Sequence, residues 1–331
     1  MKFGPVPLGQ AVGAVLAHSV ALPDGRLRKG KVLSPADIAP LEAAGLTEIT
    51  VARLEPGDVS EDAAADRLAR ALVPDSGAAH LRLGKAATGR VNLHGLVPGV
   101  LEVDAEKINA VNAVHPMITV ATLPEWQRMA PRAMAATVKI ISYAVPEAAV
   151  QAACDAAPGA LRVRPVEVGS AQLIQTVVDD DSGDKGQRAI RARLDRLGVA
   201  MGPKCVVAHR IDDLAEAIGG SEAEAILILT GSATSDLHDV APEALRRAGG
   251  RVAHFGMPVD PGNLLFFGDL RGRPVIGLPG CARSPALNGA DWVMERIFCG
   301  VPVTPGDIMG MGVGGLLKEP PSRPRPREKG Q

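Results

Sequence analysis

The stretch that decides the fold is residues 225–239, which run Ala225-Ile226-Leu227-Ile228-Leu229-Thr230-Gly231-Ser232-Ala233-Thr234-Ser235-Asp236-Leu237-His238-Asp239. The first five residues are apolar, which is typical of a strand buried on both faces of a parallel sheet. The following residues are small, hydroxyl-bearing or acidic, and they leave the carboxyl end of that strand, where open parallel sheets bind ligands. Small residues allow close backbone approach, and consecutive amides with hydroxyl groups can surround phosphate oxygens. We therefore predict an anion-binding loop, with Asp239 available to hold Mg²⁺ beside the anion.

The pattern around this stretch alternates between strands and helices from about residue 160 onward. Strands are expected at 161–166, 172–178, 205–208, 225–229, 251–255 and 274–277, and helices at 184–197, 212–218, 242–248 and 285–298. Such alternation predicts an α/β domain built on a mostly parallel sheet.

Two further glycine-containing loops fall within this region. They are Pro261-Gly262-Asn263 and Pro279-Gly280-Cys281-Ala282-Arg283-Ser284. The second passes from a strand into a helix, a geometry that favours anion binding, and Arg283 offers a counter-charge. For the loop at 230–239 a plainer interpretation also stays open, in which Ser235 or Asp236 only caps the following helix.

The N-terminal half, residues 1–146, predicts a smaller α+β region. Ser34 and Pro35 indicate a helix start, and the helix is expected to reach about Ala44. A helix is expected at 58–72 and strands at 48–52, 118–122 and 136–141, whereas 77–98 should be irregular. A helix at 147–156 would connect this region to the second domain at 160–303, and residues 304–331 would form a glycine-rich loop and a Pro/Arg-rich tail.

Composition limits the classes of function. A chain of 331 residues favours two domains, and with 46% hydrophobic but only 2% aromatic residues its core must be aliphatic. The net charge of −1 and the scarcity of aromatic rings argue against nucleic acid or a membrane surface as partner. The four cysteines are widely spaced, which favours neither zinc nor disulfides and is typical of a reducing, cytoplasmic setting. The apolar stretch Ala11–Ala17 is too short for an export signal, and no apolar run approaches a membrane span.

Three weaker patterns receive structural interpretations. Asp179-Asp180-Asp181 with Asp184 is expected to be a solvated helix start rather than a metal cluster. Gly310–Gly315 lacks a preceding strand, so it is interpreted as a flexible or partner-docking loop rather than a dinucleotide loop. The proline-rich tail beyond Glu319 is interpreted as a linker.

Over residues 162–303 the chain resembles the molybdopterin-binding (MoCF-type) domain shared by molybdopterin adenylyltransferase and molybdopterin molybdotransferase. In that family a strand leads into T-G-G-T-G and an Arg-Asp-x-Thr-Pro-Glu-Ala stretch; Thr230–Thr234 and His238–Ala244 match these without a gap. Pro261–Asn263 and Leu278–Cys281 resemble the family's P-G-K-P and L-P-G-[NS]-P loops. The resemblance implies a three-layer α/β/α fold. It also implies a homo-oligomer and a pocket lined by these loops, with Asp239 and Asp212 as the acidic residues that support catalysis.

The resemblance extends in two directions. Gly30–Ile38 and Ala44–Val51 resemble the accessory region of the molybdotransferase, and residues 121–319 resemble molybdopterin-binding modules sometimes joined to a nucleotidyltransferase-like domain. Three departures bear on mechanism. Ser232 replaces the second glycine of the family loop, His209 stands where the adenylyltransferase has an acid, and the molybdotransferase's D-G-Y-A segment is missing.

The resemblance leaves three functions open. The chain would bind molybdopterin and act in maturation or delivery of the molybdenum cofactor. Alternatively it would be an active adenylyltransferase or molybdotransferase that uses Mg²⁺ and ATP. In the third alternative it would be a scaffold that docks a nucleotidyltransferase-like domain or a molybdoenzyme. His209 and the missing D-G-Y-A favour the first function, whereas the presence of Asp239 favours the second.

Overall fold

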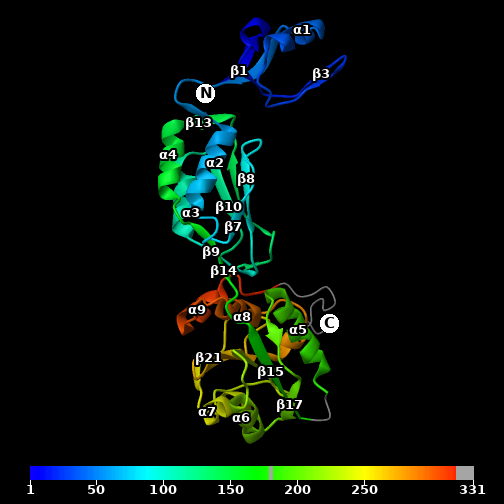
Figure 1. Cartoon of the computed structure of the whole chain (residues 1–331), viewed down its shortest axis with the longest axis vertical. Coiled ribbons are helices and arrows are strands. Elements are labelled where there is room, and N and C mark those ends of the chain that lie inside the picture. Colours follow the sequence, from blue (N-terminus) through cyan, green and yellow to red (C-terminus); the bar gives the residue numbers. More distant parts are fainter. Residues whose placement is uncertain (179–181, 318–331) are drawn as a thin grey trace, which may run out of the picture. The chain divides into compact units, whose positions relative to one another are not determined.

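The computed structural model describes residues 1–178 and 182–317. The chain divides into two compact units, which are described separately (Figure 1). Unit 1 comprises residues 1–97, 101–125 and 131–163, and unit 2 comprises 98–100, 126–130 and the chain from Arg164 onward. The predicted anion loops all lie in unit 2.

Unit 2 contains a mixed, mostly parallel sheet of seven strands. The strands are β15 (Ser170–Val177), β16 (Ala200–Met201), β17 (Cys205–Ala208), β18 (Ala225–Leu229), β19 (Arg251–Phe255), β20 (Phe266–Leu270) and β21 (Arg273–Leu278). Parallel pairing joins β15 to β16, β17 and β18, and β18 to β21. The edge is antiparallel, through β20 and β19. Leu229 stands opposite Gln175 and Leu278 in the register, so the loops after β18 and β21 leave the sheet side by side.

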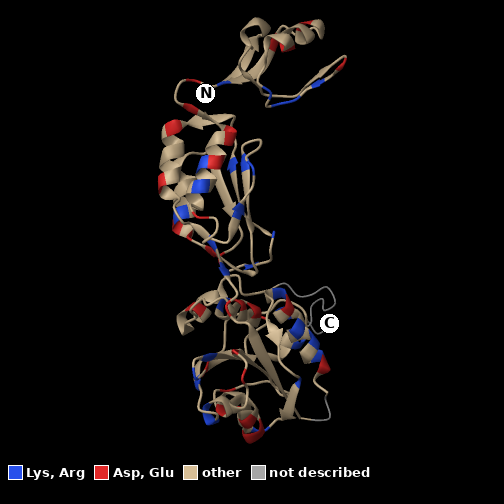
Figure 2. Cartoon of the chain, in the orientation of Figure 1, with Lys and Arg blue, Asp and Glu red and all other residues tan. Residues whose placement is uncertain are grey.

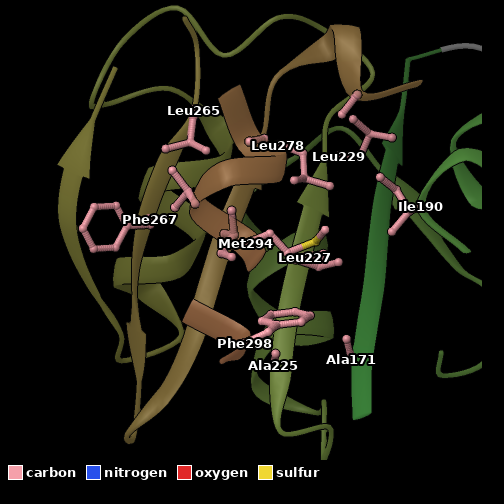
Figure 3. Close-up of a cluster of buried hydrophobic side chains, with 14 of the residues drawn as sticks. Ala171, Ile190, Ala225, Leu227, Leu229, Leu265, Phe267, Leu278, Met294 and Phe298 are labelled. Carbon is pink, nitrogen blue, oxygen red and sulfur yellow. The ribbon is translucent and has the colours of Figure 1, made fainter. Parts of the chain in front are cut away.

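Strand β18 is buried along its whole length and separates two apolar clusters. Ala225, Leu227 and Leu229 belong to one cluster, together with residues of α5 (Asp184–Leu197) and α8 (Gly289–Phe298). Figure 3 shows these three side chains on the same side of the strand as Met294, Phe298 and Ile190. Ile226 and Ile228 face the other way, into a cluster that includes residues of α6 (Ile211–Gly219) and α7 (Val240–Arg247). Burial on both faces of the sheet therefore explains why every residue of β18 is apolar.

The first part of unit 1 is a small domain of residues 1–53. Strands β1 (Lys2–Pro7) and β2 (Val15–Leu16) pair antiparallel with the two sides of β5 (Glu48–Arg53). Helix α1 (Pro35–Ala43) begins with a capping box between Ser34 and Asp37. Its Leu41 joins the apolar cluster of this segment. The segment also contains the short helix η1 (Leu8–Gln10) and the hairpin of β3 (Val20–Leu22) and β4 (Gly25–Leu27).

The rest of unit 1 is built on a four-stranded antiparallel sheet, ordered β10-β12-β8-β7. These strands are β7 (Leu81–Leu83), β8 (Arg90–Gly95), β10 (Ile118–Thr122) and β12 (Met134–Ile140). The helices are α2 (Glu61–Leu72), α3 (Ala105–Val114) and α4 (Glu147–Ala156). The short strands β6 (Asp58–Ser60) and β13 (Ala144–Pro146) form an antiparallel pair. Strands β9 (Gly99–Val103), β11 (Arg128–Met129) and β14 (Leu161–Pro165) form a separate sheet.

Several sequence predictions need correction. Residues 77–98 are not irregular, because β7 and β8 occupy much of this range. Residues 58–60 start as a strand paired with β13 rather than as a helix. Strand β14, expected to open the parallel sheet, lies outside it, and β20 was not predicted. The helix expected from 285 begins at Gly289, after the short helix η2 (Gly280–Arg283).

The segment after α8 also differs from expectation. Residues 305–312 form α9 (Pro305–Met309) and η3 (Gly310–Gly312), and Met311 is buried. Beyond them, Leu317 donates its backbone N–H to the carbonyl oxygen of Asp260, and Asp260 donates to that of Gly315. The glycine-rich loop is thus held by backbone hydrogen bonds. The predicted Asp179–Asp181 helix start and the tail from residue 318 lie outside the described residues.

The surface carries charges of both signs in each unit (Figure 2). This distribution agrees with the net charge of −1. No helix in residues 1–178 and 182–317 is long and apolar enough to cross a bilayer.

Candidate functional site

The loop after β18 begins with a glycine that packs against the end of β15. A Cβ atom on Gly231 would lie 2.9 Å from the carbonyl oxygen of Thr176 and 3.1 Å from Cα of Val177. Backbone atoms cannot move aside cheaply, so only glycine fits here. The Gly231 amide donates to the Thr176 hydroxyl oxygen at 2.9 Å. This contact fixes the start of the loop on the neighbouring strand.

The next three amides of this loop have no protein acceptor. Within residues 1–178 and 182–317, no group accepts a hydrogen bond from the backbone nitrogens of Ser232, Ala233 or Thr234. Thr234 is itself buried, and its hydroxyl oxygen lies 3.3 Å from that of buried Thr230. Successive free amides at the carboxyl end of a parallel strand are donors that can bind an anion.

Asp239 is the N-cap of α7. Its two carboxylate oxygens accept the backbone N–H groups of Val240 at 2.7 Å and Ser235 at 2.9 Å. The helix cap therefore falls on Asp239, not on Ser235 or Asp236 as the plainer interpretation expected. The Asp236 carboxylate instead accepts the amide of His238 at 2.8 Å within the loop. The residue chosen as metal ligand is thus the one that closes the loop onto the helix.

The loop after β21 lies against the first loop. Arg283, at the end of η2, donates from Nη2 to the carbonyl oxygen of Thr230 at 2.6 Å. In the described part of the chain, no backbone carbonyl oxygen accepts the amides of Gly280 and Cys281. Burial raises the pKa of the Cys281 thiol above its usual range, so the sulfur stays neutral near pH 7 and does not repel an anion.

A buried arginine that the sequence analysis missed holds this second loop from behind. Arg193 of α5 donates from Nη1 to the carbonyl oxygen of Ala282 at 3.1 Å, and from Nη2 to those of Ser284 at 2.9 Å and Ala286 at 3.0 Å. Its Nε donates to the Asp291 carboxylate of α8 at 2.5 Å, and Nη1 also reaches the Ala189 carbonyl oxygen at 3.1 Å. All five guanidinium N–H groups are thereby used. We call this set of contacts the Arg193 clamp.

A second buried carboxyl group lies one helical turn beyond the clamp. Glu295 of α8 is 9% exposed and lies 3.2 Å from Arg128 Nε. Burial, reinforced by the charge of Asp291, raises the pKa of Glu295 to about 7, despite the opposing effect of Arg128. The ion pair with Arg128 favours the charged carboxylate, whereas burial favours the neutral acid. Burial has the larger effect, because a single arginine at the edge does not replace the lost hydration.

The loop Pro261–Asn263 packs on the start of α8. The Gly289 amide donates to the carbonyl oxygen of Pro261 at 2.9 Å, and a Cβ on Gly262 would lie 2.7 Å from that same amide nitrogen. Gly262 has φ of 145°, a conformation that favours glycine. The backbone carbonyl oxygen of Asn263 accepts the Met257 amide at 3.0 Å. This loop is thus fastened to the start of α8.

Asp212 lies apart from these loops. It is in the first turn of α6, and its carboxylate pairs with Arg247 at the last residue of α7. Asp239 caps the opposite end of α7, an eight-residue helix that is roughly 12 Å long. The structure therefore brings together the two loops around Thr230 and Arg283 and fastens Pro261–Asn263 to the start of α8, but it does not bring Asp212 to Asp239.

The donor set does not fit Mg²⁺. Octahedral Mg²⁺ in proteins takes one or two carboxylates together with water and phosphate oxygens. Here both carboxylates of the loop are already engaged within the protein: Asp239 accepts two amides, and Asp236 accepts the amide of His238. Among residues 1–178 and 182–317, no group of three or more His, Cys, Asp or Glu side chains could hold a metal ion. No step that depends on Mg²⁺ is therefore derived for this site.

Thr176 and Arg193 were missed, although each leaves a signal. Thr176, 1% exposed, belongs to the polar pair Gln175-Thr176 near the end of the buried strand β15. Arg193 occupies an apolar-face position of α5, between Ile190 and Leu194 in the periodic pattern of buried residues. A polar residue at a core position usually has specific partners. That rule would have singled out both residues.

Comparisons with known proteins assign no family to the whole chain. Residues 5–53 match a family model described as a domain of unknown function, DUF8806. No curated protein matches. Solved structures that resemble the chain include the molybdopterin biosynthesis MoeA protein from Pyrococcus horikosii. That match has 12% sequence identity and a TM-score of 0.29, and covers 94% of this chain and 76% of the other. With a TM-score this low, we base no argument about fold or function on it.

Proposed function

We propose that this chain is a molybdopterin-binding protein that carries or delivers molybdopterin during maturation of the molybdenum cofactor. One observation carries the proposal: the consecutive free amides of Ser232, Ala233 and Thr234 follow the buried strand β18, in the loop that matches the family's T-G-G-T-G motif. The MoCF-type three-layer fold is part of the same proposal, supported by the apolar clusters on both faces of β18.

The chemistry of the loops supports a phosphorylated ligand. Molybdopterin ends in a phosphate monoester, which needs several hydrogen-bond donors and a positive environment. The amides after β18 and those of Gly280 and Cys281 supply donors, and the contact between Arg283 and the Thr230 carbonyl oxygen holds the two groups together. We assign the phosphate to these amides and the pterin to the space bordered by Pro261–Asn263.

The carrier role is favoured over catalysis. Adenylyl transfer on molybdopterin would use acidic groups and Mg²⁺ to neutralise the reacting phosphates. In this chain Asp239 is engaged as a helix cap, Asp212 pairs with Arg247, and His209 occupies the remaining acidic position of the family. These three features support binding without turnover.

Binding and catalysis separate in one experiment. The full chain is incubated with molybdopterin, MgATP and molybdate, and bound and released pterin species are identified by fluorescence after oxidation. We expect stoichiometric bound molybdopterin, without adenylylated product and without inserted molybdenum. Either product would overturn the carrier role, and absence of binding by folded protein would overturn both functions.

A charge variant tests the location of the site. Ala233→Asp places a carboxylate in the exposed loop after β18 and should weaken molybdopterin binding by at least about a hundredfold through like-charge repulsion. Ala192→Asp makes the same change at an exposed position of α5 and should bind like the unaltered chain. Equal affinity of the two variants would place the ligand elsewhere.

A partner remains part of the proposal. A carrier must hand its ligand to a molybdoenzyme or to a nucleotidyltransferase-like domain, and the segment 320–331 would serve as the connection. Capture of a purified molybdoenzyme by the full chain and by a chain lacking 320–331 tests this. Unchanged capture would exclude the segment from docking. Light scattering of the same samples tests the expected homo-oligomer.

A further inference from the structure

The hydroxyl group of Thr176 links the end of β15 to two neighbours. It accepts the Gly231 amide at 2.9 Å, and its oxygen lies 2.8 Å from Nδ1 of His209, the residue after β17. Thr176 is 1% exposed, so solvent does not compete for these contacts. One buried oxygen atom therefore holds both the start of the Thr230–Asp239 loop and the imidazole ring.

Counting protons at this oxygen fixes the tautomer of His209. A threonine hydroxyl has one proton to donate, and the Gly231 N–H uses one of its acceptor positions. In the described part of the chain Nδ1 of His209 is the one acceptor available for that proton, so Nδ1 accepts it. The proton of the neutral imidazole then lies on Nε2, and in the imidazolium Nε2 is protonated as well. In both forms Nε2 is a donor.

The far edge of the ring is available to a ligand. His209 is half-buried. Its Nε2 does not belong to the described polar atoms that are both buried and without a partner. The neighbouring charges are already paired: Arg210 bonds Asp213 at 2.6 Å, and Asp212 pairs with Arg247. Because Nδ1 of His209 and the Gly231 amide meet at the same Thr176 oxygen, the ring lies next to the start of the loop whose amides at Ser232–Thr234 have no acceptor in the described part of the chain.

We propose that His209 donates from Nε2 to the ligand's phosphate, so that this site binds a phosphate monoester directly and without a divalent cation. The inference rests on the proposed function, which places the ligand at the Thr230–Asp239 loop. A protonated nitrogen attracts an anion and repels a cation. His209 thus stands where a carboxylate would bind a metal cation. Its N–H attracts the phosphate directly instead.

Two amide substitutions provide a matched test. His209→Gln places an amide nitrogen near the position of Nε2, whereas His209→Asn places one near Nδ1 only. Molybdopterin affinity of the full chain is measured by calorimetry in EDTA and in Mg²⁺. We expect the unaltered chain and His209→Gln to bind equally in both buffers, within about threefold, and His209→Asn to bind about tenfold or more weakly.

A second pair of measurements ties the effect to the phosphate. Dephosphorylated molybdopterin should bind the unaltered chain and His209→Asn with equal, weaker affinity, because the donor then has no anion to meet. His209→Asp should bind poorly in EDTA and regain affinity in Mg²⁺, because it restores a carboxylate. His18→Asn, at an exposed position of unit 1, is the control and should leave binding unchanged.

The outcomes separate the two proposals. If the unaltered chain binds molybdopterin but requires Mg²⁺, or if His209→Asn binds as tightly as His209→Gln, this inference is wrong while the proposed function stands. If the unaltered chain does not bind molybdopterin, the proposed function fails and this inference fails with it. Thermal unfolding of each variant identifies losses that are due to misfolding.

Discussion

The loops after β18 and β21 leave neighbouring strands at the same edge of one sheet, yet they are stabilised in different ways. The second loop is fastened from behind by the Arg193 clamp, which satisfies the carbonyl oxygens of Ala282, Ser284 and Ala286. The first loop is fixed at its two ends, by Gly231 on Thr176 and by Asp239 on α7, and its central amides are left free. Rigid support for one loop and open donors in the other are the two features that the proposed anion site requires.

Removing the Arg193 clamp, which supports only the second loop, should have the largest effect. Arg193→Met keeps roughly the length of the side chain but leaves Oδ1 of Asp291 and the carbonyl oxygens of Ala282, Ser284 and Ala286 without the donors that Arg193 supplies. We expect the free energy of unfolding to fall by about 3–5 kcal/mol, as measured by urea denaturation. Arg191→Met, an exposed change on the same helix, should stay within about 0.5 kcal/mol. Equal effects would show that the clamp does not stabilise the fold.

The acid beside the clamp should make stability depend on pH. The pKa of Glu295 is about 7 in the folded chain, against 4.5 for an unperturbed glutamate carboxyl. A raised carboxyl pKa stabilises the fold below pH 4.5, and this contribution is lost as pH rises to about 7. Between these limits the loss approaches about 3 kcal/mol. Glu295→Gln should remove this slope. The stability of the variant should therefore increase relative to that of the unaltered chain from pH 5 to pH 8. Parallel stability curves would contradict the assignment.

A smaller effect is expected at the start of the first loop. Gly231→Ala forces a methyl group against the backbone of Thr176 and Val177, which should cost about 1–3 kcal/mol of unfolding free energy. It should also weaken ligand binding, because the free amides shift. Gly219→Ala at the end of α6, where a Cβ meets nothing within 4 Å, provides the matched control and should be neutral or slightly stabilising. A neutral Gly231→Ala would refute the close packing.

The smallest effect separates the two roles considered for Asp239. Asp239→Ala removes both acceptors and should cost about 1 kcal/mol, whereas Asp239→Asn keeps one capping oxygen, loses the acceptor of one amide and should cost roughly half as much. If Asp239 acts through its helix cap, Asp239→Asn should also keep molybdopterin affinity in Mg²⁺. A normal fold with lost affinity in Mg²⁺ would restore the metal-ligand interpretation.

Local patterns predicted much of unit 2 correctly. The helix at 184–197 and the strands at 205–208, 225–229 and 251–255 have the predicted bounds, because each carries its own periodicity or a short apolar run. The start of α1 was equally clear, since Ser34, Pro35 and Asp37 are close in sequence and form the cap together. In such elements the deciding contacts lie within a few residues.

The missed features depend on contacts between distant segments. Strand β20 contains Gly268, where a Cβ would lie 2.0 Å from the carbonyl oxygen of Arg251, so the glycine that weakens the local signal is required by the neighbouring strand. At the candidate site, sequence predicted the loops but not their fastening. The hydrogen bond between Gly231 and Thr176 joins residues 55 positions apart, and no local pattern reports such a pairing.

The Arg193 clamp also has a consequence for the order of events during synthesis. Its contacts with Ala282, Ser284, Ala286 and Asp291 join α5 to residues 89 to 98 positions further along the chain. A nascent chain halted before Asp291 can contain β18 and its whole loop, yet it cannot close the clamp behind the neighbouring loop. The clamp therefore closes late, only after α8 has emerged from the ribosome, and if the proposed site binds its ligand, ribosome-bound intermediates should not sequester it.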